Sequence, residues 1–138
     1  MAETLPTKIR LEVVTPERLL FSEDIDEVTI PGSEGYLGVL PGHLPLLTAI
    51  GVGILSYRQG TQKHIFAVNR GFAEVLGDRV IVLARSVERP QEIDLARAQA
   101  DKQQAEKLLY SKEQIDVDAA MTELMKATTR IQVAEMKQ

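Results

Sequence analysis

Residues 31–47 read PGSEGYLGVLPGHLPLL, a stretch that holds four glycines and three prolines in 17 positions. Glycine and proline at this density are typical of tight turns between strands. On either side, residues 27–30 and 53–57 follow the period-two alternation of a half-buried strand. Turns alone explain the glycines and prolines, whereas the apolar residues among them favour a loop that packs on a partner. The stretch therefore predicts β-structure with a contact surface.

Glycine divides the chain into two parts, because all nine glycines lie between Gly32 and Gly77. Further alternating segments occur at residues 9–13, 65–69, 72–76 and 79–84, with Gly77 and Asp78 as a tight connection. Many short strands at this spacing favour an antiparallel β-sandwich of about ten strands. We assign this sandwich to residues 1–88.

The remaining residues, 89–138, are rich in helix-forming side chains. Residues 94–110 consist largely of Ala, Leu, Gln, Lys, Arg and Glu, and residues 111–116 form a short connection. A second helix starts at Val117, because apolar residues then recur at three- and four-residue steps. The predicted fold class is therefore mixed: an N-terminal antiparallel β-sandwich followed by a C-terminal antiparallel two-helix hairpin.

The apolar stripe of the first helix is thin and rich in alanine. It comprises Leu95, Ala98, Ala105, Leu108 and Leu109. A buried Leu contributes about 1.5–3 kcal/mol and Ala far less, so two such helices alone are marginal in water. The hairpin is expected to need a second surface or to exchange between two arrangements.

Composition excludes several functional classes. The net charge is −4 and aromatic residues make up 4% of the chain, which argues against a nucleic-acid partner. There is no cysteine, which removes disulfides and thiol chemistry. The first residues lack an apolar signal segment and no long apolar run follows, so membrane association is expected only through partners.

No catalytic or metal site is expected. The two histidines, His43 and His64, belong to none of the known catalytic or nucleotide-binding motifs. The acidic cluster of Glu23, Asp24, Asp26 and Glu27 lacks the spacing and glycine of a calcium loop, so we interpret it as a solvated turn. The chain is not expected to be an enzyme by itself. A free-standing adaptor and a small enzyme with an unrecognised site are the alternatives to a subunit of a larger assembly.

The start of the first helix has two interpretations. Asp94 suits the N-cap position, and Arg97 lies one turn further, where it can pair with Asp94. Alternatively, the acid, the arginine and the helix start together form a small polar site for a nucleotide. Spacing alone leaves both open.

Three segments in this order resemble the epsilon subunit family of the F-type ATP synthase. They are the glycine-rich run at residues 32–48, NRGFAEV at residues 69–75 and RIQVA at residues 130–134. The likeness covers essentially the whole chain, and the first segment is its most specific part.

The resemblance implies partners for the sandwich. It would lie on the central stalk against the gamma subunit and the c-ring, and would couple ring rotation to the alpha/beta catalytic hexamer. The implied contact residues are Ser33, Glu34, Tyr36, Pro41, Gly42 and His43. Tyr36 stands where relatives can carry an acidic side chain. The implied location is peripheral, on the cytoplasmic face of a bacterial plasma membrane, with a thylakoid or organellar membrane as the alternative.

The resemblance also implies a regulatory hairpin, which extends into the hexamer to block ATP hydrolysis. No cofactor is required, but some bacterial members bind ATP on the folded hairpin as a regulatory ligand. Their motif corresponds here to Glu88, Ile93, Asp94, Arg97, Ala98, Lys126 and Arg130. Lys126 and Gln104 stand in place of arginines, which implies weaker ATP binding.

Overall fold

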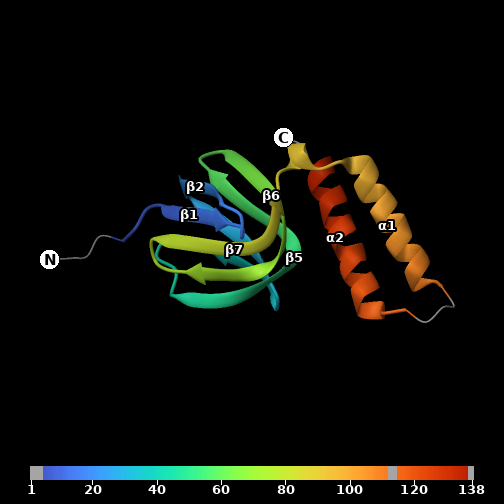
Figure 1. The fold of residues 1–138 in the computed structure, drawn as a ribbon. Helices are drawn as coiled ribbons and strands as arrows, with labels where there is room; N and C mark the ends of the chain where they lie inside the picture. The colour runs from blue at the N-terminus through green and yellow to red at the C-terminus, as the bar shows by residue number, and fades with distance from the viewer. Residues whose placement is uncertain (1–4, 112–114, 137–138) are drawn as a thin grey trace.

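The computed structural model describes residues 5–111 and 115–136. It contains a β-sandwich followed by two antiparallel helices, α1 (Leu95–Leu109) and α2 (Val117–Glu135). Helix α2 lies between the sandwich and α1 (Figure 1). The predicted two-part fold is confirmed, although the connection predicted at residues 111–116 includes residues 112–114, outside the described residues.

Seven strands form the sandwich as one continuous sheet in the order β2-β1-β7-β6-β5-β3-β4. The strands are β1 (Ile9–Val14), β2 (Leu19–Ile25), β3 (Glu27–Gly32), β4 (Gly35–Val39), β5 (Leu46–Gln59), β6 (Gln62–Val75) and β7 (Arg79–Glu88). All neighbours are antiparallel except β1 and β7, which run parallel. The purely antiparallel prediction is corrected at this pair, because the first and last strands meet side by side in the same direction.

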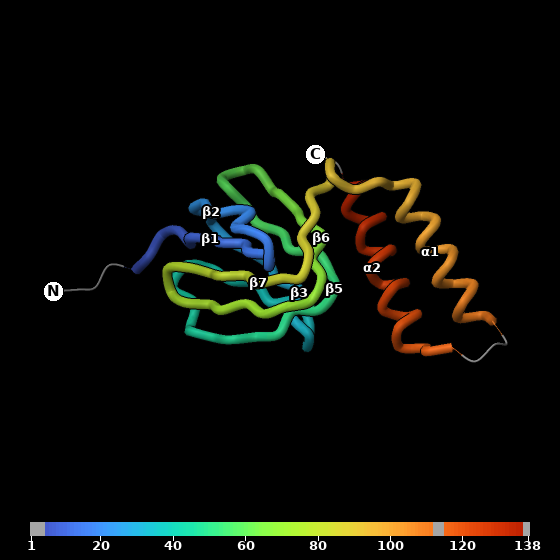
Figure 2. The backbone as a smooth tube through the Cα atoms, in the orientation of Figure 1, coloured from blue at the N-terminus to red at the C-terminus, as the bar shows by residue number. Residues whose placement is uncertain are grey.

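The strands are fewer and longer than predicted, because β5 and β6 each have 14 residues. Residues 65–69 and 72–76, predicted as two strands, are joined in β6, apart from Leu76. Between them Arg70 has a φ of 42°, and a Cβ on Gly71 would lie 1.8 Å from the carbonyl oxygen of Leu83. This corner bends the strand instead of ending it, and β5 and β6 curve where they face α2 (Figure 2).

Strand β2 was not predicted, and the solvated-turn interpretation of the acidic cluster is wrong for Glu23 and Asp24, which lie in this strand. Strand β2 is at an edge of the sheet, and only Phe21 and Ile25 are buried. Because so few of its side chains face the core, its sequence lacks the alternation that marks the inner strands.

The core is formed by aliphatic side chains from all seven strands. Ile9, Leu11 and Val13 of β1 alternate inward, as predicted. Phe21 and Tyr57 pack with ring centroids 4.9 Å apart, and Tyr57 and Phe66 lie 5.7 Å apart. Three aromatic rings thus pack together in a core that otherwise consists of aliphatic side chains.

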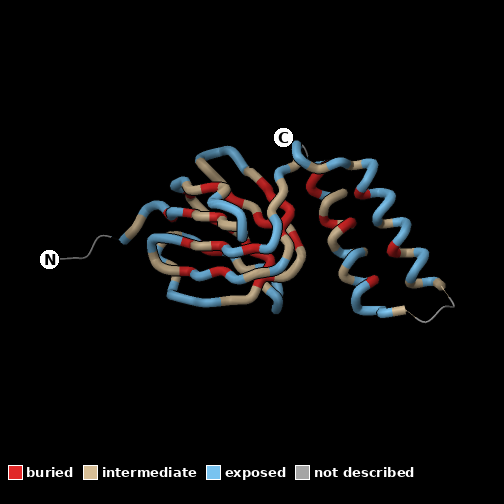
Figure 3. The backbone as a smooth tube through the Cα atoms, in the orientation of Figure 1, coloured by how far each residue is buried: buried red, intermediate tan, exposed pale blue. Residues whose placement is uncertain are grey.

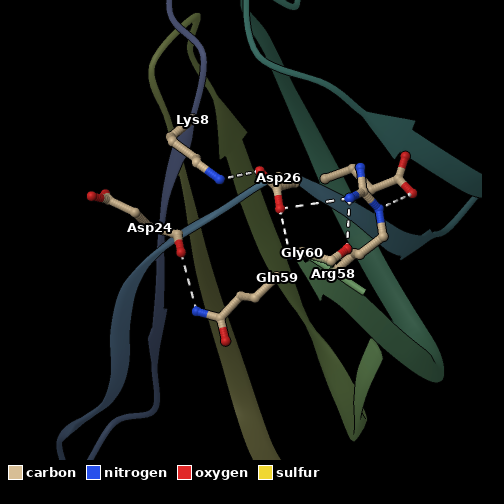
Figure 4. Close-up of polar contacts among 7 residues, drawn as sticks. Lys8, Asp24, Asp26, Arg58, Gln59 and Gly60 are labelled. Carbon is tan, nitrogen blue, oxygen red and sulfur yellow. Dashed lines mark hydrogen bonds and ion pairs between the residues drawn. The ribbon is translucent and has the colours of Figure 1, made fainter. Parts of the chain in front are cut away.

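A polar network closes the end of the sandwich where β2 turns into β3 (Figure 4). Asp26 accepts a hydrogen bond from the Lys8 ammonium and one of 2.6 Å from the backbone N–H of Gly60. Arg58 lies 3.6 Å from the same carboxylate. The Lys8 hydrogen bond, followed by that of Gly60, lowers the pKa of Asp26 below its ordinary value of 3.8 despite partial desolvation. Asp26 therefore ties three segments together in its ionised form.

This network predicts acid sensitivity. A carboxylate with a lowered pKa stabilises the fold above its ordinary pKa, here 3.8, and this contribution is lost as the pH falls through the lower folded value. Below pH 3.8, we expect the unfolding free energy of Asp26→Asn to fall less steeply with decreasing pH than that of the wild type. Lys8→Met should act in the same direction, because it removes the first donor. Urea titrations across the acid range measure the slopes, and identical slopes for wild type and Asp26→Asn would contradict the assignment.

Candidate functional site

The helical hairpin begins at two aspartate caps. Asp94 Oδ1 accepts a hydrogen bond of 3.1 Å from the N–H of Arg97, and Asp116 Oδ1 accepts one of 3.1 Å from the N–H of Ala119. These contacts satisfy backbone donors that the first turn of a helix leaves free. The N-cap interpretation of Asp94 is therefore confirmed.

Small side chains form the seam between α1 and α2, where buried residues face each other (Figure 3). The buried helical residues are Ala98, Ala105, Ala120, Ala127, Thr129, Val133 and Ala134. The alanine-rich stripe is thus confirmed, but Leu108 is 39% exposed and contributes little to it. Close approach of two helices along alanine buries little apolar area, so the pair is weakly held.

A small apolar cluster docks the hairpin on the sandwich. Val133 of α2 is fully buried against Ile65 and Ala67 of β6, and Ile54 and Ile93 pack at the margin. One well-buried Val and one Ile correspond to about 3–6 kcal/mol of transfer free energy before ordering costs. The docked state is therefore stable by a small margin only.

Two arginines add polar contacts to this interface. Arg70, at the bent corner of β6, donates a hydrogen bond of 3.0 Å from Nη2 to Oγ1 of Thr122. Arg130 of α2 lies 2.9 Å, through Nε, from Glu88 Oε1, and its Nη2 donates a hydrogen bond of 3.2 Å to Glu88 Oε2. The end of β7 is thus tied to the middle of α2.

A cavity of about 210 Å³ lies between the sheet and the hairpin. Its lining includes Glu88, Lys126 and Arg130, three of the seven predicted nucleotide-binding residues. The other four lie near the start of α1: Asp94 caps it, Arg97 is exposed, Ala98 is buried in the seam and Ile93 packs on the docking cluster. The seven residues therefore form two groups, one in the cavity and one at the helix start.

The cavity residues that sequence reasoning missed include Asn69, Asp101 and Glu123. The signal for Asp101 was present, because it lies three residues after Ala98 and four before Ala105, next to the buried stripe. Glu123 occupies the same position on α2, three residues after Ala120 and four before Ala127. Asp101 pairs with Arg130 across the hairpin, whereas Glu123 pairs with Lys126 on its own helix.

The electrostatics of the cavity are slightly unfavourable for an anion. Three carboxylates, Glu88, Asp101 and Glu123, face two cations, Lys126 and Arg130. Lys126 Nζ lies 3.3 Å from Glu123 Oε1, and Arg130 Nη1 lies 3.6 Å from Asp101 Oδ2. Each cation thus already has a carboxylate partner within the protein.

The predicted contact residues of the sandwich lie along one edge of the sheet. Ser33 and Glu34 form the turn between β3 and β4, whereas Pro41 and Gly42 form the turn after β4, next to His43. Tyr36 of β4 is 62% exposed, and its hydroxyl accepts a hydrogen bond of 3.1 Å from the N–H of Ile54. The six residues are thus spread over the whole edge strand and are not gathered at one point.

Leucines surround the second of these turns. Leu40, Leu44 and Leu47 are 56%, 80% and 69% exposed. The N–H of Gly42 donates a hydrogen bond of 2.8 Å to the carbonyl oxygen of Gly77, which fixes the loop on the β6–β7 turn. Exposed leucines beside an anchored turn are typical of contact surfaces, and the partner contact stays a prediction.

Within residues 5–111 and 115–136, no group of three or more metal-ligating side chains could hold a metal ion. Neither described helix combines the length and the apolar character needed to span a membrane.

Both parts of the chain match models of known protein families. The sequence model for the ATP synthase delta/epsilon chain beta-sandwich domain matches residues 8–90. The corresponding model for the long alpha-helix domain of the same chain matches residues 91–135. The chain belongs to the ATP synthase delta/epsilon chain family. The likeness inferred from residues 32–48, 69–75 and 130–134 is thereby confirmed.

Curated relatives extend this family assignment over nearly the full length. The ATP synthase epsilon chain of Desulforamulus reducens is 50% identical over 127 residues, covering 91% of this chain and 96% of the relative. That of Dehalococcoides mccartyi is 46% identical over 132 residues and covers 94% of both chains.

Two solved structures contain chains with the same fold. A chain in the OSCP/F1/c-ring structure of the Euglena gracilis mitochondrial ATP synthase has a TM-score of 0.85 at 23% identity, covering 96% of this chain and 84% of that one. A chain in the central stalk and c-ring structure of the Tetrahymena thermophila enzyme has a TM-score of 0.60 at 15% identity, covering 96% and 97%. At these identities the likeness concerns the fold.

A substitution in the docking cluster of this delta/epsilon-family chain is expected to detach the hairpin from the sandwich. Val133→Asp would bury an unpaired charge against Ile65, which is strongly unfavourable, so the hairpin should leave the sandwich. We expect faster amide exchange throughout α2 with unchanged exchange in β1 and β7. Val117→Asp is the matched control, because Val117 on the same helix is 56% exposed. Equal exchange of α2 in the two variants would contradict the docking role.

Proposed function

We propose that this chain is the epsilon subunit of an F-type ATP synthase. In this role it is a non-catalytic part of the central stalk that couples rotation of the c-ring to the catalytic hexamer. The observation that carries the proposal is that relatives 46–50% identical over more than nine-tenths of the chain are ATP synthase epsilon chains. The proposal covers the sandwich and the hairpin together, because both family models match.

The proposed partners are a gamma subunit, the c-ring and the alpha/beta hexamer. The structural relatives come from assemblies described as F1 with the c-ring and as the central stalk with the c-ring. The edge strand β4, with its turns at Ser33–Glu34 and Pro41–His43, is the proposed contact surface, and the exposed leucines on either side of the second turn support that choice. The subunit would be peripheral, on the cytoplasmic face of a bacterial plasma membrane.

We further propose that the hairpin restrains ATP hydrolysis when it leaves the sandwich. The support is physical: the hairpin has an alanine seam and docks through Val133 and a few neighbours. A marginally docked element can be redistributed between two packings by a few kcal/mol, which another subunit can supply. The sandwich, with a much larger core, remains folded in either state.

ATP is the proposed ligand of the docked hairpin. Arg97 at the start of α1 is exposed, and Lys126 and Arg130 line the adjoining cavity, so cations are available for phosphate oxygens. Lys126 in place of an arginine offers a point charge and no bidentate fork, and Gln104 offers no charge. The carboxylates already bound to Lys126 and Arg130 also oppose an anionic ligand. We therefore propose weak, millimolar ATP binding.

The regulatory role predicts the effect of removing the hairpin. An assembled ATP synthase whose subunit lacks residues 89–138 should hydrolyse ATP faster than the intact enzyme, while rotation-coupled synthesis is retained. A cross-link that fixes α2 to β6 should have the same effect on hydrolysis. ATPase assays of the three complexes measure this, and three equal rates would contradict the regulatory role without affecting the proposed place in the stalk.

The nucleotide proposal predicts protection from hydrogen exchange. At a concentration about equal to its Kd, a ligand stabilises the bound state by about 0.4 kcal/mol, which slows exchange through opening about twofold. We expect millimolar ATP to protect residues 94–98 and α2. Arg97→Gln should abolish this protection, whereas Lys102→Gln, which removes a cation paired with Glu106 on the same helix, should retain it. Unchanged exchange on titration with ATP would exclude the site.

A further inference from the structure

The cavity between the sheet and the hairpin contains a contact that the proposed nucleotide site does not use. Arg130 has two carboxylate neighbours from different elements: Glu88 at the end of β7, 2.9 Å from Nε, and Asp101 of α1, 3.6 Å from Nη1. A single guanidinium therefore joins the sandwich, α1 and α2. The Arg130 side chain is 23% exposed, so its charge is partly withdrawn from water.

The position of Asp101 makes this contact decisive for the two helices. Asp101 lies between the buried Ala98 and Ala105 in the sequence of α1, with its side chain 51% exposed at the margin of the seam, and Arg130 lies between Ala127 and Ala134 of α2. Alanine seams fix the register of two helices poorly, because one alanine packs much like the next. A charged pair at the margin of such a seam favours one register, because a shift of α1 by one turn separates Asp101 from Arg130, which keeps Glu88 as its partner.

The charge of Asp101 also affects any anion that enters the cavity. With Glu88 and Glu123 it gives the lining one more carboxylate than cations. A phosphate group that approaches Arg130 must compete with carboxylates that already neutralise the guanidinium. Removing the charge of Asp101 would leave Glu88 on Arg130 and would bring the lining to balance.

We propose that Asp101 is an internal anion that occupies Arg130 in place of a ligand phosphate. It holds α1 on α2 in the docked hairpin without nucleotide, and it lowers the affinity of the cavity for anions. The lowered affinity for anions rests on the proposed nucleotide site. The closure of the hairpin by Asp101 rests only on the contact between Asp101 and Arg130.

The test uses the full chain and three substitutions. Asp101→Asn removes the charge with almost no change in shape, and Asp101→Glu retains the charge. Glu106→Gln is the matched control, because Glu106 is a partly exposed carboxylate on the same helix that pairs only along the surface with Lys102 at 4.0 Å. Far-UV circular dichroism verifies that all variants retain their helices.

The first measurement is amide exchange without nucleotide. We expect α1 and α2 to exchange about three- to fivefold faster in Asp101→Asn, the range that a partly exposed ion pair provides. Asp101→Glu should retain most of the protection, and Glu106→Gln should match wild type. If Asp101→Asn exchanges like wild type, or if Glu106→Gln is equally fast, the closure by Asp101 is overturned, whatever ATP does.

The second measurement is calorimetric titration of the same chains with ATP. Asp101→Asn should bind ATP about three- to fivefold more tightly than wild type, with no change in Glu106→Gln. Equal affinity of wild type and Asp101→Asn would overturn the competition with a ligand. If no chain binds ATP but Asp101→Asn still loosens the hairpin, the proposed nucleotide site fails and the closure by Asp101 is supported.

Discussion

The alanine seam between α1 and α2 determines how firmly the second half of this molecule is held. Small side chains let the two helices approach closely, but they remove little apolar surface from water. The sandwich core, by contrast, includes fully buried Ile9, Leu11, Ile30 and Leu55. One chain thus contains a rigid part and a part whose opening requires little free energy, a distribution common in elements that move.

Where apolar burial is small, polar contacts determine geometry more than stability. Glu88, Asp101 and Arg130 together contribute little net free energy, because each is partly exposed to water. They nevertheless define one docked arrangement, since the guanidinium contacts both carboxylates only when β7, α1 and α2 are in register. The same arginine is available for another anion once the helices separate. A weak seam and a specific polar contact are therefore complementary features of an element with two positions.

The helices were predictable from local signals, and the bends of the sheet were not. Asp94 and Asp116 cap the helices where composition changes, so α1 and α2 began close to the predicted residues. The continuity of β6 depends on the conformation of Arg70 and on the contact of Gly71 with Leu83, a residue of another strand. Glu88 and Arg130 are far apart in sequence, and only the resemblance related them. Asp101 was recognisable in principle, because its charge lies next to the alanine stripe.

The parallel pairing of β1 with β7 affects how the chain is made. Leu11 pairs with Val80, so this contact closes a loop of about 70 residues and forms slowly compared with the hairpins between them. During synthesis, one side of β1 has no strand beside it until the ribosome has delivered β7. Until then the edge of β6 is also open to other chains. The nascent sandwich is therefore most exposed to aggregation just before its last strand emerges.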